Sequence, residues 1–278
     1  MASFESVADE YDAARPSYPA GIYDALGDLD GLRVLDVGAG TGIATRQLRE
    51  RGARVVAIDP GRAVLARAVS HTPGLPAVVA DGARLPIRDE AADLVCFAQS
   101  WHWLAAETRV DEVHRVLRPS GRWAGWWSHP RADDEGWFDE YWSTIELTCG
   151  GTHRDQRDID WGATIDVPGM FDVSDRVAVP WTRSISIDEW LTDQVSHSYV
   201  VALDEATRND LVARLRRILE AAFPTGTMAV RCETWLWTAT AQSGAMRVGF
   251  GPGAMGGAGI GSGRVRSVDD GIVPRGQA

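Results

Sequence analysis

The sequence predicts an α/β domain built on a doubly wound, parallel β-sheet. Short, continuously apolar runs recur between residues 33 and 127 and alternate with segments whose apolar residues have helical spacing. This alternation is typical of parallel strands that helices cover on both faces. Several of the apolar runs also end at an aspartate or a glutamine, which gathers polar groups at one edge of the sheet. Ligands of doubly wound domains bind beyond that edge.

Each element is expected from its own local pattern. The apolar runs predict strands at residues 33–37, 54–58, 77–80, 93–97 and 122–127. Amphipathic spacing predicts helices at residues 42–50, 64–69, 107–117, 137–147, 187–195 and 204–223. Two further strands are expected at residues 175–181 and 231–238, and Pro119-Ser120-Gly121 is expected to form a turn.

Composition excludes several classes of protein. The net charge is −11, which disfavours a nucleic-acid partner because such proteins usually carry a basic face. No apolar run reaches the roughly 18 residues of a membrane span, and residues 1–6 do not begin a secretion signal. The three cysteines are far apart, which argues against a disulfide framework and a metal site. We therefore expect a cytoplasmic protein with no nucleic-acid, membrane or metal partner.

The strongest motif is the glycine loop, Asp36-Val37-Gly38-Ala39-Gly40-Thr41-Gly42, which follows the first predicted strand. Glycines let a backbone turn sharply and approach a ligand, and the helix that follows presents its positive end. The spacing is G-x-G-x-G, whereas a dinucleotide fingerprint has G-x-G-x-x-G. This difference favours S-adenosylmethionine over a nicotinamide cofactor, with a ligand-free strand–helix turn as the alternative.

Acidic residues follow the next two predicted strands. Asp59 ends the second strand, where a carboxylate can accept hydrogen bonds from both hydroxyls of a ribose. Its alternative role is to cap a helix or to lie in a surface turn. Asp81 follows the third strand and could accept a hydrogen bond from an adenine amino group, or could be an ordinary loop acid.

Further stretches extend this pattern and carry a family resemblance. The sequence resembles the class I S-adenosylmethionine-dependent methyltransferases, and within them the bacterial small-molecule enzymes related to ubiquinone/menaquinone and trans-aconitate methyltransferases. The resemblance covers residues 4 to 238. It rests on the glycine loop and on residues 4–16, 56–60, 81–86, 99–103 and 112–121.

The resemblance implies a Rossmann-like, seven-stranded methyltransferase sheet with helical cap insertions. It also implies a division of the chain into a cofactor-closing segment at 1–30, a cofactor-binding core at 31–130, and a substrate-side insertion with the final strands at 131–238. Residues 239–278 form a fourth segment. From residue 241 onward, the chain holds 11 of the 29 glycines and few large apolar residues. Such a segment cannot bury enough surface to offset the entropy of ordering, so we expect it to be disordered.

The resemblance assigns cofactor contacts by position. The methionine end of the cofactor is expected at Asp36 and at the backbone of Gly38, Ala39, Gly40 and Gly42. The ribose is expected at Asp59, next to Pro60, the adenine at Asp81 and Gly82, and the sulfonium beside Gln99. Tyr11 and Arg15 are expected on the segment that closes over the cofactor. Arg15 could pair with a carboxylate of cofactor or substrate, or could be a solvated surface residue.

Methyl transfer depends chiefly on proximity, alignment and exclusion of water, and needs a general base only for a hydroxyl or ammonium acceptor. The candidates are His102, between Trp101 and Trp103, and His129, after the fifth strand. Each could instead be a packed histidine. Trp101 and Trp103 could wall the acceptor pocket, where an indole also suits a sulfonium.

The sequence thus predicts a methyltransferase that transfers a methyl group from S-adenosylmethionine to an oxygen, nitrogen or carbon of a small molecule. The alternative from another class is a non-methylating S-adenosylmethionine-binding protein, or a cyclase on the same fold. A nucleic-acid methyltransferase is less favoured, because residues 98–101 read Ala-Gln-Ser-Trp where such enzymes carry an Asn/Asp-Pro-Pro-aromatic motif. The sequence carries no indication of the oligomeric state.

Overall fold

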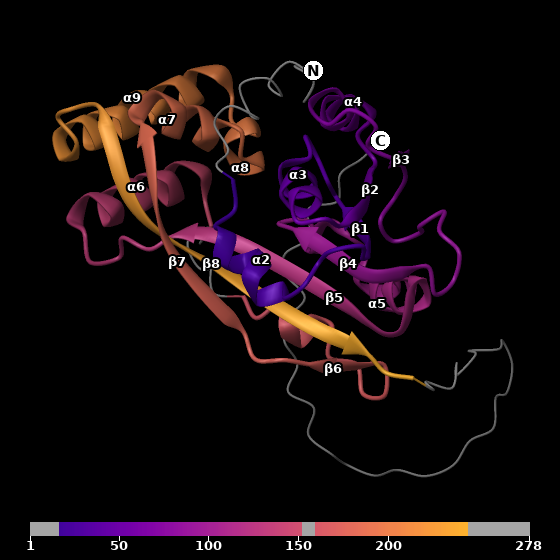
Figure 1. Cartoon of the computed structure of the whole chain (residues 1–278). Coiled ribbons are helices and arrows are strands. Elements are labelled where there is room, and N and C mark those ends of the chain that lie inside the picture. The colour runs from indigo at the N-terminus through magenta and orange to yellow at the C-terminus, as the bar shows by residue number, and fades with distance from the viewer. Residues whose placement is uncertain (1–16, 152–158, 244–278) are drawn as a thin grey trace, which may run out of the picture. The chain divides into compact units, whose positions relative to one another are not determined.

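The computed structural model describes residues 17–151 and 159–243 (Figure 1). Tyr11, Arg15 and the glycine-rich end from residue 244 lie outside the described residues, so their expected roles stay predictions. None of the described helices is both long and apolar enough to span a membrane.

The described chain folds around one mixed β-sheet, and the predicted α/β class is confirmed. The strand order is β3-β2-β1-β4-β5-β8-β6, with β7 also paired to β8. Strands β1 to β5 run parallel, and β8 runs antiparallel to β5. The bounds are β1 Arg33–Val37, β2 Arg54–Asp59, β3 Ala77–Val79, β4 Ala92–Ala98, β5 Leu117–Pro130, β6 Phe171–Val173, β7 Val177–Ser186 and β8 Thr227–Ala241.

Strand β8 explains why the sheet contains eight strands. Its residues 232–240 pair with β5 along one edge. Along the other edge, residues 227–236 pair with β7 and residues 239–241 pair with β6. Two strands therefore share the seventh position of the doubly wound sheet, end to end along β8.

Helices cover both faces of the parallel part of the sheet (Figure 1). Successive residues of a strand point to opposite faces. Accordingly, Val34 packs with residues of α2 (Ala20–Leu26) and α3 (Ile43–Glu50), whereas Leu35 packs with residues of α5 (Ala106–Val116). Helix α4 (Arg62–His71) packs on Ala57 of β2. Strands β1, β2 and β4 are thus largely buried on both faces, as the continuous apolar runs predicted, whereas the edge strand β3 is exposed at Ala77 and Val79.

A helical cap surrounds the far ends of β7 and β8. It consists of α6 (Gly136–Cys149), α7 (Ile187–Val195), α8 (Ser198–Val201) and α9 (Glu205–Ala222), which share an apolar core with Met228 and Val230. Ser186 and Glu189 form a capping box at the start of α7, and Asp204 caps α9 through the backbone N–H of Thr207. These caps explain why the helices begin where the sequence predicts.

Several boundaries differ from the sequence-based expectation. The strand expected at residues 175–181 is β7, which continues to Ser186, and the strand expected at 122–127 is β5, which continues to Pro130. The expected turn at Pro119-Ser120-Gly121 lies inside β5, where the register with β4 shifts and Ser120 has φ +61°. A bulge there absorbs the extra residues without ending the strand. The final strand extends from 227 to 241 instead of 231–238, because Ala239 and Ala241 are buried against β6. The fourth segment of the chain therefore begins after this strand, not at 239. The short β6 and α2 were not predicted.

Candidate active site

The three glycines of the glycine loop have left-handed backbones, with φ values of +73°, +56° and +84° at Gly38, Gly40 and Gly42. A Cβ atom on Gly38 would lie 2.3 Å from the Cβ of Ser100, and one on Gly42 would lie 2.9 Å from that of Ala68. A Cβ on Gly40 would meet nothing within 4 Å. Gly38 and Gly42 are thus required by close packing, while Gly40 borders open space that a ligand can occupy.

The N–H groups of the glycine loop bond mainly to neighbouring β2. Gly38 and Ala39 donate to the carbonyl of Ile58, at 2.8 and 3.1 Å, and Gly40 donates to Asp59 Oδ2 at 2.9 Å. A dinucleotide fingerprint instead turns such N–H groups toward a pyrophosphate. The loop therefore does not offer these three N–H donors to a phosphate. The sequence predicted that its backbone approaches a ligand, but these three groups are already bonded within the protein, which suits a cofactor without phosphate groups.

Asp36 lies at the base of the glycine loop and is fully buried. Its Oδ2 accepts a 2.5 Å hydrogen bond from Thr45 Oγ1 of α3, while Oδ1 has no hydrogen-bond partner in the described chain. The pKa of Asp36 is raised to about 6. Burial is the main cause and the charge of Asp59 adds to it, while the hydrogen bonds from Thr45 act in the opposite direction. A buried carboxylate oxygen without a partner suits a cationic ligand group beyond the loop.

Asp59 joins two loops at the end of β2. Besides Gly40, its carboxylate accepts from the backbone N–H of Gly61 at 2.7 Å, across Pro60. Gly61 is the N-cap residue of α4. Each carboxylate oxygen can accept more than one hydrogen bond, so both remain able to accept from ribose hydroxyls. Asp59 thus has a structural role at the end of β2, and its contact with a ribose stays a prediction.

The loop after β3 brings Gly82 against the end of β1. A Cβ on Gly82 would lie 2.6 Å from Val37 Cγ1, so only glycine fits there. Asp81 is exposed, and its Oδ1 accepts from the backbone N–H of Ala83 at 2.9 Å. The other carboxylate oxygen of Asp81 takes no part in this turn, and the contact of Asp81 with adenine stays a prediction.

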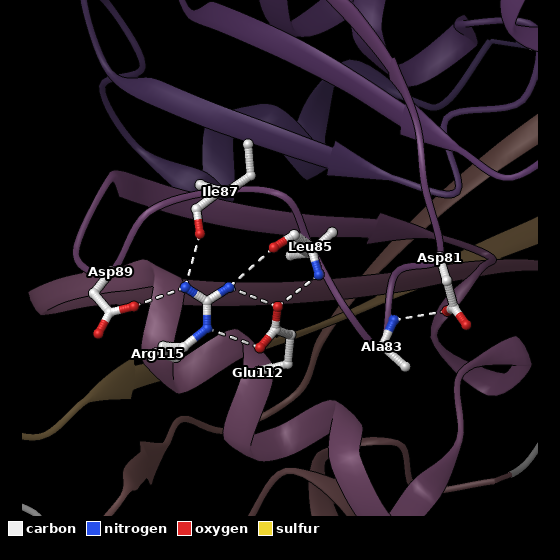
Figure 2. A network of polar contacts seen from close by, with 7 residues as sticks. All are labelled: Asp81, Ala83, Leu85, Ile87, Asp89, Glu112 and Arg115. Atoms are coloured by element: carbon white, nitrogen blue, oxygen red, sulfur yellow. Dashed lines mark hydrogen bonds and ion pairs between the residues drawn. The ribbon is translucent and has the colours of Figure 1, made fainter.

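Figure 2 shows how the same loop is anchored to α5. Arg115 donates to the carbonyls of Leu85 and Ile87 and to the carboxylates of Asp89 and Glu112. Glu112 accepts in turn from the Leu85 N–H at 2.6 Å. Burial acts to raise the pKa of Glu112, but the hydrogen bonds from Arg115 and Leu85 lower it overall. The ion pair therefore fixes the loop that carries Asp81.

Gln99 and Ser100 follow β4, beside the glycine loop. Strands β1 and β4 are neighbours at the point where the strand order reverses, which is the binding crevice of a doubly wound sheet. Gln99 has φ +57°, and its N–H donates to the carbonyl of Trp126. Ser100 Oγ donates to the carbonyl of Val37 at 2.5 Å. Gln99 turns the chain with a left-handed backbone conformation, which is strained for a residue other than glycine. Such strain is often found at functional sites.

An aromatic cluster lies directly beyond Ser100. His102 accepts a 3.4 Å hydrogen bond from Trp127 Nε1 through its Nδ1, and its ring centroid lies 4.7 Å from that of Trp103. Trp127 stacks on Trp161 at 4.7 Å with an interplanar angle of 14°. Trp103 is 73% exposed. These side chains form one aromatic cluster, in which Trp103 is exposed and Trp127 is buried.

Trp101 and His129 lie outside this aromatic cluster. Trp101 is fully buried in the core and donates from Nε1 to Thr164 Oγ1 at 2.8 Å, so it does not line a pocket. His129 is half-buried on β5, opposite Glu233 of β8. It shares a face with Trp127 but lies about 7 Å farther along the strand. His102 is therefore the histidine that belongs to the aromatic cluster, three residues after Gln99.

The described residues fit a nucleoside-type cofactor and contain no group of three or more His, Cys, Asp or Glu side chains suited to a metal ion. Open space at Gly40, the unpartnered oxygen of Asp36, and acceptors at Asp59, Asp81 and Gln99 all meet at the carboxyl edge of the sheet. Backbone and carboxylate oxygens at this edge suit the ammonium, ribose and amino groups of S-adenosylmethionine.

Sequence reasoning missed four residues that build this site. Thr45 bonds to Asp36, Ser100 packs on Gly38, Trp161 stacks on Trp127, and Tyr18 bonds to Gln99; no local sequence motif indicates these contacts. Only Thr45 had a signal, since it lies in the first turn of the helix that follows the glycine loop. The others are brought in by tertiary packing.

Comparison with known proteins agrees with this geometry. A model of the methyltransferase domain matches residues 35–124. An uncharacterized methyltransferase of Mycobacterium tuberculosis is 34% identical over 217 residues, which cover 78% of this chain and 85% of the relative. A demethylmenaquinone methyltransferase of Beutenbergia cavernae is 34% identical over 128 residues, covering 43% of this chain and 53% of that protein.

Solved structures agree on the fold. A putative type II methyltransferase from Anaeromyxobacter dehalogenans has a TM-score of 0.63 at 24% identity, covering 82% of this chain and 97% of that one. A putative methyltransferase of an antibiotic biosynthesis pathway from Anabaena variabilis has a TM-score of 0.54 at 16% identity, covering 78% and 97%. The chain belongs to the class I S-adenosylmethionine-dependent methyltransferases.

Proposed function

We propose that the protein transfers the methyl group of S-adenosylmethionine to an oxygen, nitrogen or carbon atom of a small molecule. The observation that carries the proposal is the position of the aromatic cluster, which begins two residues after Ser100 and therefore borders the same crevice as the glycine loop. A methyl donor held at the loop would face an acceptor held against these rings.

We place the acceptor surface at His102, the exposed Trp103 and the half-buried Trp161, which contact Trp127, itself only 4% exposed. Indole faces contribute apolar area and can also stack on a planar or cationic acceptor. The net charge of −11 makes a polyanionic nucleic acid an unfavourable acceptor. We therefore favour a small acceptor with an apolar or planar body.

His102 is better suited to orient the acceptor than to deprotonate it. In a neutral imidazole one nitrogen accepts and the other donates. Because Nδ1 accepts from Trp127, the neutral ring would carry its proton on Nε2 and would act there as a hydrogen-bond donor instead of a base. His129, farther along β5, remains the second candidate for a base.

The cofactor, when bound, supplies an electrophilic methyl group on a good leaving group. The protein contributes alignment and exclusion of water, which can account for roughly 7–11 kcal/mol of a barrier. Asp36, Asp59 and Gln99 would fix the donor, while the indoles would fix the acceptor and displace solvent. No proton transfer is needed for an acceptor that is already a carboxylate or a thiolate.

A non-methylating binding protein or a cyclase on the same fold is the alternative, because cofactor binding does not require turnover. Release of S-adenosylhomocysteine in the presence of carboxylic acids, phenols and amines tests the proposal. Turnover with at least one acceptor class supports it; tight cofactor binding with no release across the panel would favour the alternative. Three free cysteines agree with a reducing, cytoplasmic setting, which we also propose.

Two substitutions of His102 separate its possible roles. The variant His102→Gln keeps a side-chain donor, whereas His102→Leu has neither donor nor acceptor. If His102 orients the acceptor, His102→Gln retains most activity and His102→Leu loses it. Equal loss in both variants, with a changed pH profile, would identify His102 as a base instead.

A further inference from the structure

Tyr18 is attached to the glycine-loop helix by its backbone. Its N–H donates to Gln47 Oε1 at 3.0 Å, and its carbonyl accepts from Gln47 Nε2 at 2.7 Å. Gln47 lies on α3, the helix that follows the glycine loop. One side-chain amide therefore holds both backbone groups of Tyr18, and any shift of α3 is passed to this residue.

The side chain of Tyr18 reaches the other wall of the crevice. Its hydroxyl accepts from Gln99 Nε2 at 3.3 Å. Its ring packs edge-on against Trp126, with centroids 5.7 Å apart and an interplanar angle of 86°. Trp126 is fully buried, and its carbonyl accepts the N–H of Gln99. Tyr18 and Trp126 together hold the backbone and the amide of Gln99.

The resulting chain of contacts links the two sides of the binding crevice. It runs from α3 through Gln47 and Tyr18 to Gln99, at the turn after β4. The amide nitrogen of Gln99 is engaged, while its amide oxygen has no hydrogen-bond partner in the described part of the chain. That oxygen carries a partial negative charge and is the group left for a ligand.

We propose that Tyr18 is a positioning residue that holds the Gln99 amide with its oxygen toward the sulfonium of bound S-adenosylmethionine. The inference rests on the proposed function and deepens it, since it assigns the recognition of the charged donor over the spent product. The donor has a positive sulfonium, and the product has a neutral thioether. An amide oxygen at this place favours the donor and eases release of the product.

Without the Tyr18 hydroxyl, the Gln99 amide can rotate and present its NH₂ group with the opposite partial charge. The preference for S-adenosylmethionine over S-adenosylhomocysteine then falls. We expect Tyr18→Phe to lower the ratio of the two affinities by roughly fivefold, the scale of one neutral hydrogen bond. Both ligands are measured by calorimetry, so the experiment needs no knowledge of the acceptor.

Tyr23→Phe is a matched control. Tyr23 also donates to Gln47 Oε1, at 3.1 Å, and also packs edge-on against Trp126, with centroids 6.0 Å apart. No hydrogen bond joins it to Gln99 among the described residues. The same chemical change at Tyr23 should leave the affinity ratio at the wild-type value, whatever it does to the melting temperature.

A double-mutant cycle completes the test. In a Gln99→Leu background, Tyr18→Phe should change the ratio no further, because the group that it positions is gone. An unchanged ratio in Tyr18→Phe, an equal fall in Tyr23→Phe, or additive effects in the cycle would each overturn the inference. If the wild-type protein bound neither ligand, the proposed function itself would fail, which is a distinguishable result.

Discussion

Replacing Asp36 by asparagine should remove a pH dependence of the folding free energy that lies between about pH 4 and pH 6. Burial raises the pKa of Asp36 from 3.8 to about 6 in the folded protein. The folded state therefore binds more protons than the unfolded state in this window. By linkage, the free energy of unfolding must fall as the pH rises through the window, since the buried carboxyl is forced to ionise.

The magnitude follows from the size of the shift. The step from 3.8 to about 6 corresponds to roughly 3 kcal/mol, at about 1.4 kcal/mol per pH unit. No discount for solvent screening applies, because Asp36 is fully buried. Set against a typical domain stability of roughly 5–15 kcal/mol, the effect is large enough to measure by urea unfolding.

The assay compares urea unfolding of the wild-type protein and Asp36→Asn from pH 4 to pH 8, without cofactor. Carboxyl groups that do not interact with Asp36 titrate equally in both proteins, so the difference between the two curves reports Asp36 together with its charge interaction with Asp59. That difference should move against the wild-type protein as the pH rises and should level off above about pH 7. Asparagine keeps an oxygen that can accept from Thr45 Oγ1, which limits other damage.

A second variant, Thr45→Val, moves the window in a known direction. It removes the side-chain hydrogen bond that lowers the pKa of Asp36, so the pH dependence should extend above pH 6. Parallel stability curves for wild type and Asp36→Asn over the whole range would refute the reasoning, because they would mean that Asp36 has the same pKa folded and unfolded.

Three other predictions concern separate parts of the molecule. Hydrogen bonds from Arg33 hold the pKa of Asp93 well below its usual range, and the charge of Arg118 acts in the same direction. These interactions therefore stabilise the folded protein above about pH 4, and this stabilisation is lost in acid. Asp93→Asn should thus cost about 1–3 kcal/mol at pH 7 in urea unfolding, and the loss should shrink at low pH; a constant loss would contradict this. Gly38→Ala should lower the affinity for S-adenosylmethionine by about tenfold or more in calorimetry, since its Cβ would meet Ser100 at a φ of +73°, and Ser100→Gly should restore part of it. Trp103→Ala should change the stability by less than about 0.5 kcal/mol, because the ring is 73% exposed, yet raise the KM for the methyl acceptor; a loss of cofactor affinity instead would place Trp103 outside the acceptor surface.

The sequence predicted the parallel part of the fold well because each buried strand is a continuous apolar run. Strand β8 was harder. Its buried residues alternate at its start, through Met228 and Val230, and are continuous only from Thr234 to Trp237. The two halves face different partners, the helical cap and the main sheet, so one period does not describe the strand. The bulge at Ser120 was predicted to be a turn because the neighbouring Pro119 and Gly121 are typical turn residues. The local sequence does not show that the strand continues beyond them.

For the site, local motifs were sufficient where the contact is local. Gly38 to Gly42 and Asp59 lie on consecutive strand ends, and their arrangement follows from the topology. Tyr18 and Trp161 come from segments 81 and 34 residues away from their partners Gln99 and Trp127, and no spacing rule connects them. The sequence also did not predict the structural role of Asp59, because its hydrogen bonds with Gly40 and Gly61 depend on tertiary structure.

The central claim is that S-adenosylmethionine binds at the carboxyl edge of the sheet, against the glycine loop and Asp59. Calorimetric titration of wild type and Asp59→Asn with S-adenosylmethionine and with a nicotinamide dinucleotide tests it most directly. The structure predicts one site for S-adenosylmethionine, weakened by about 1–3 kcal/mol in Asp59→Asn, and no binding of the dinucleotide. Binding of the dinucleotide, or an unchanged affinity for S-adenosylmethionine in Asp59→Asn, would contradict the account.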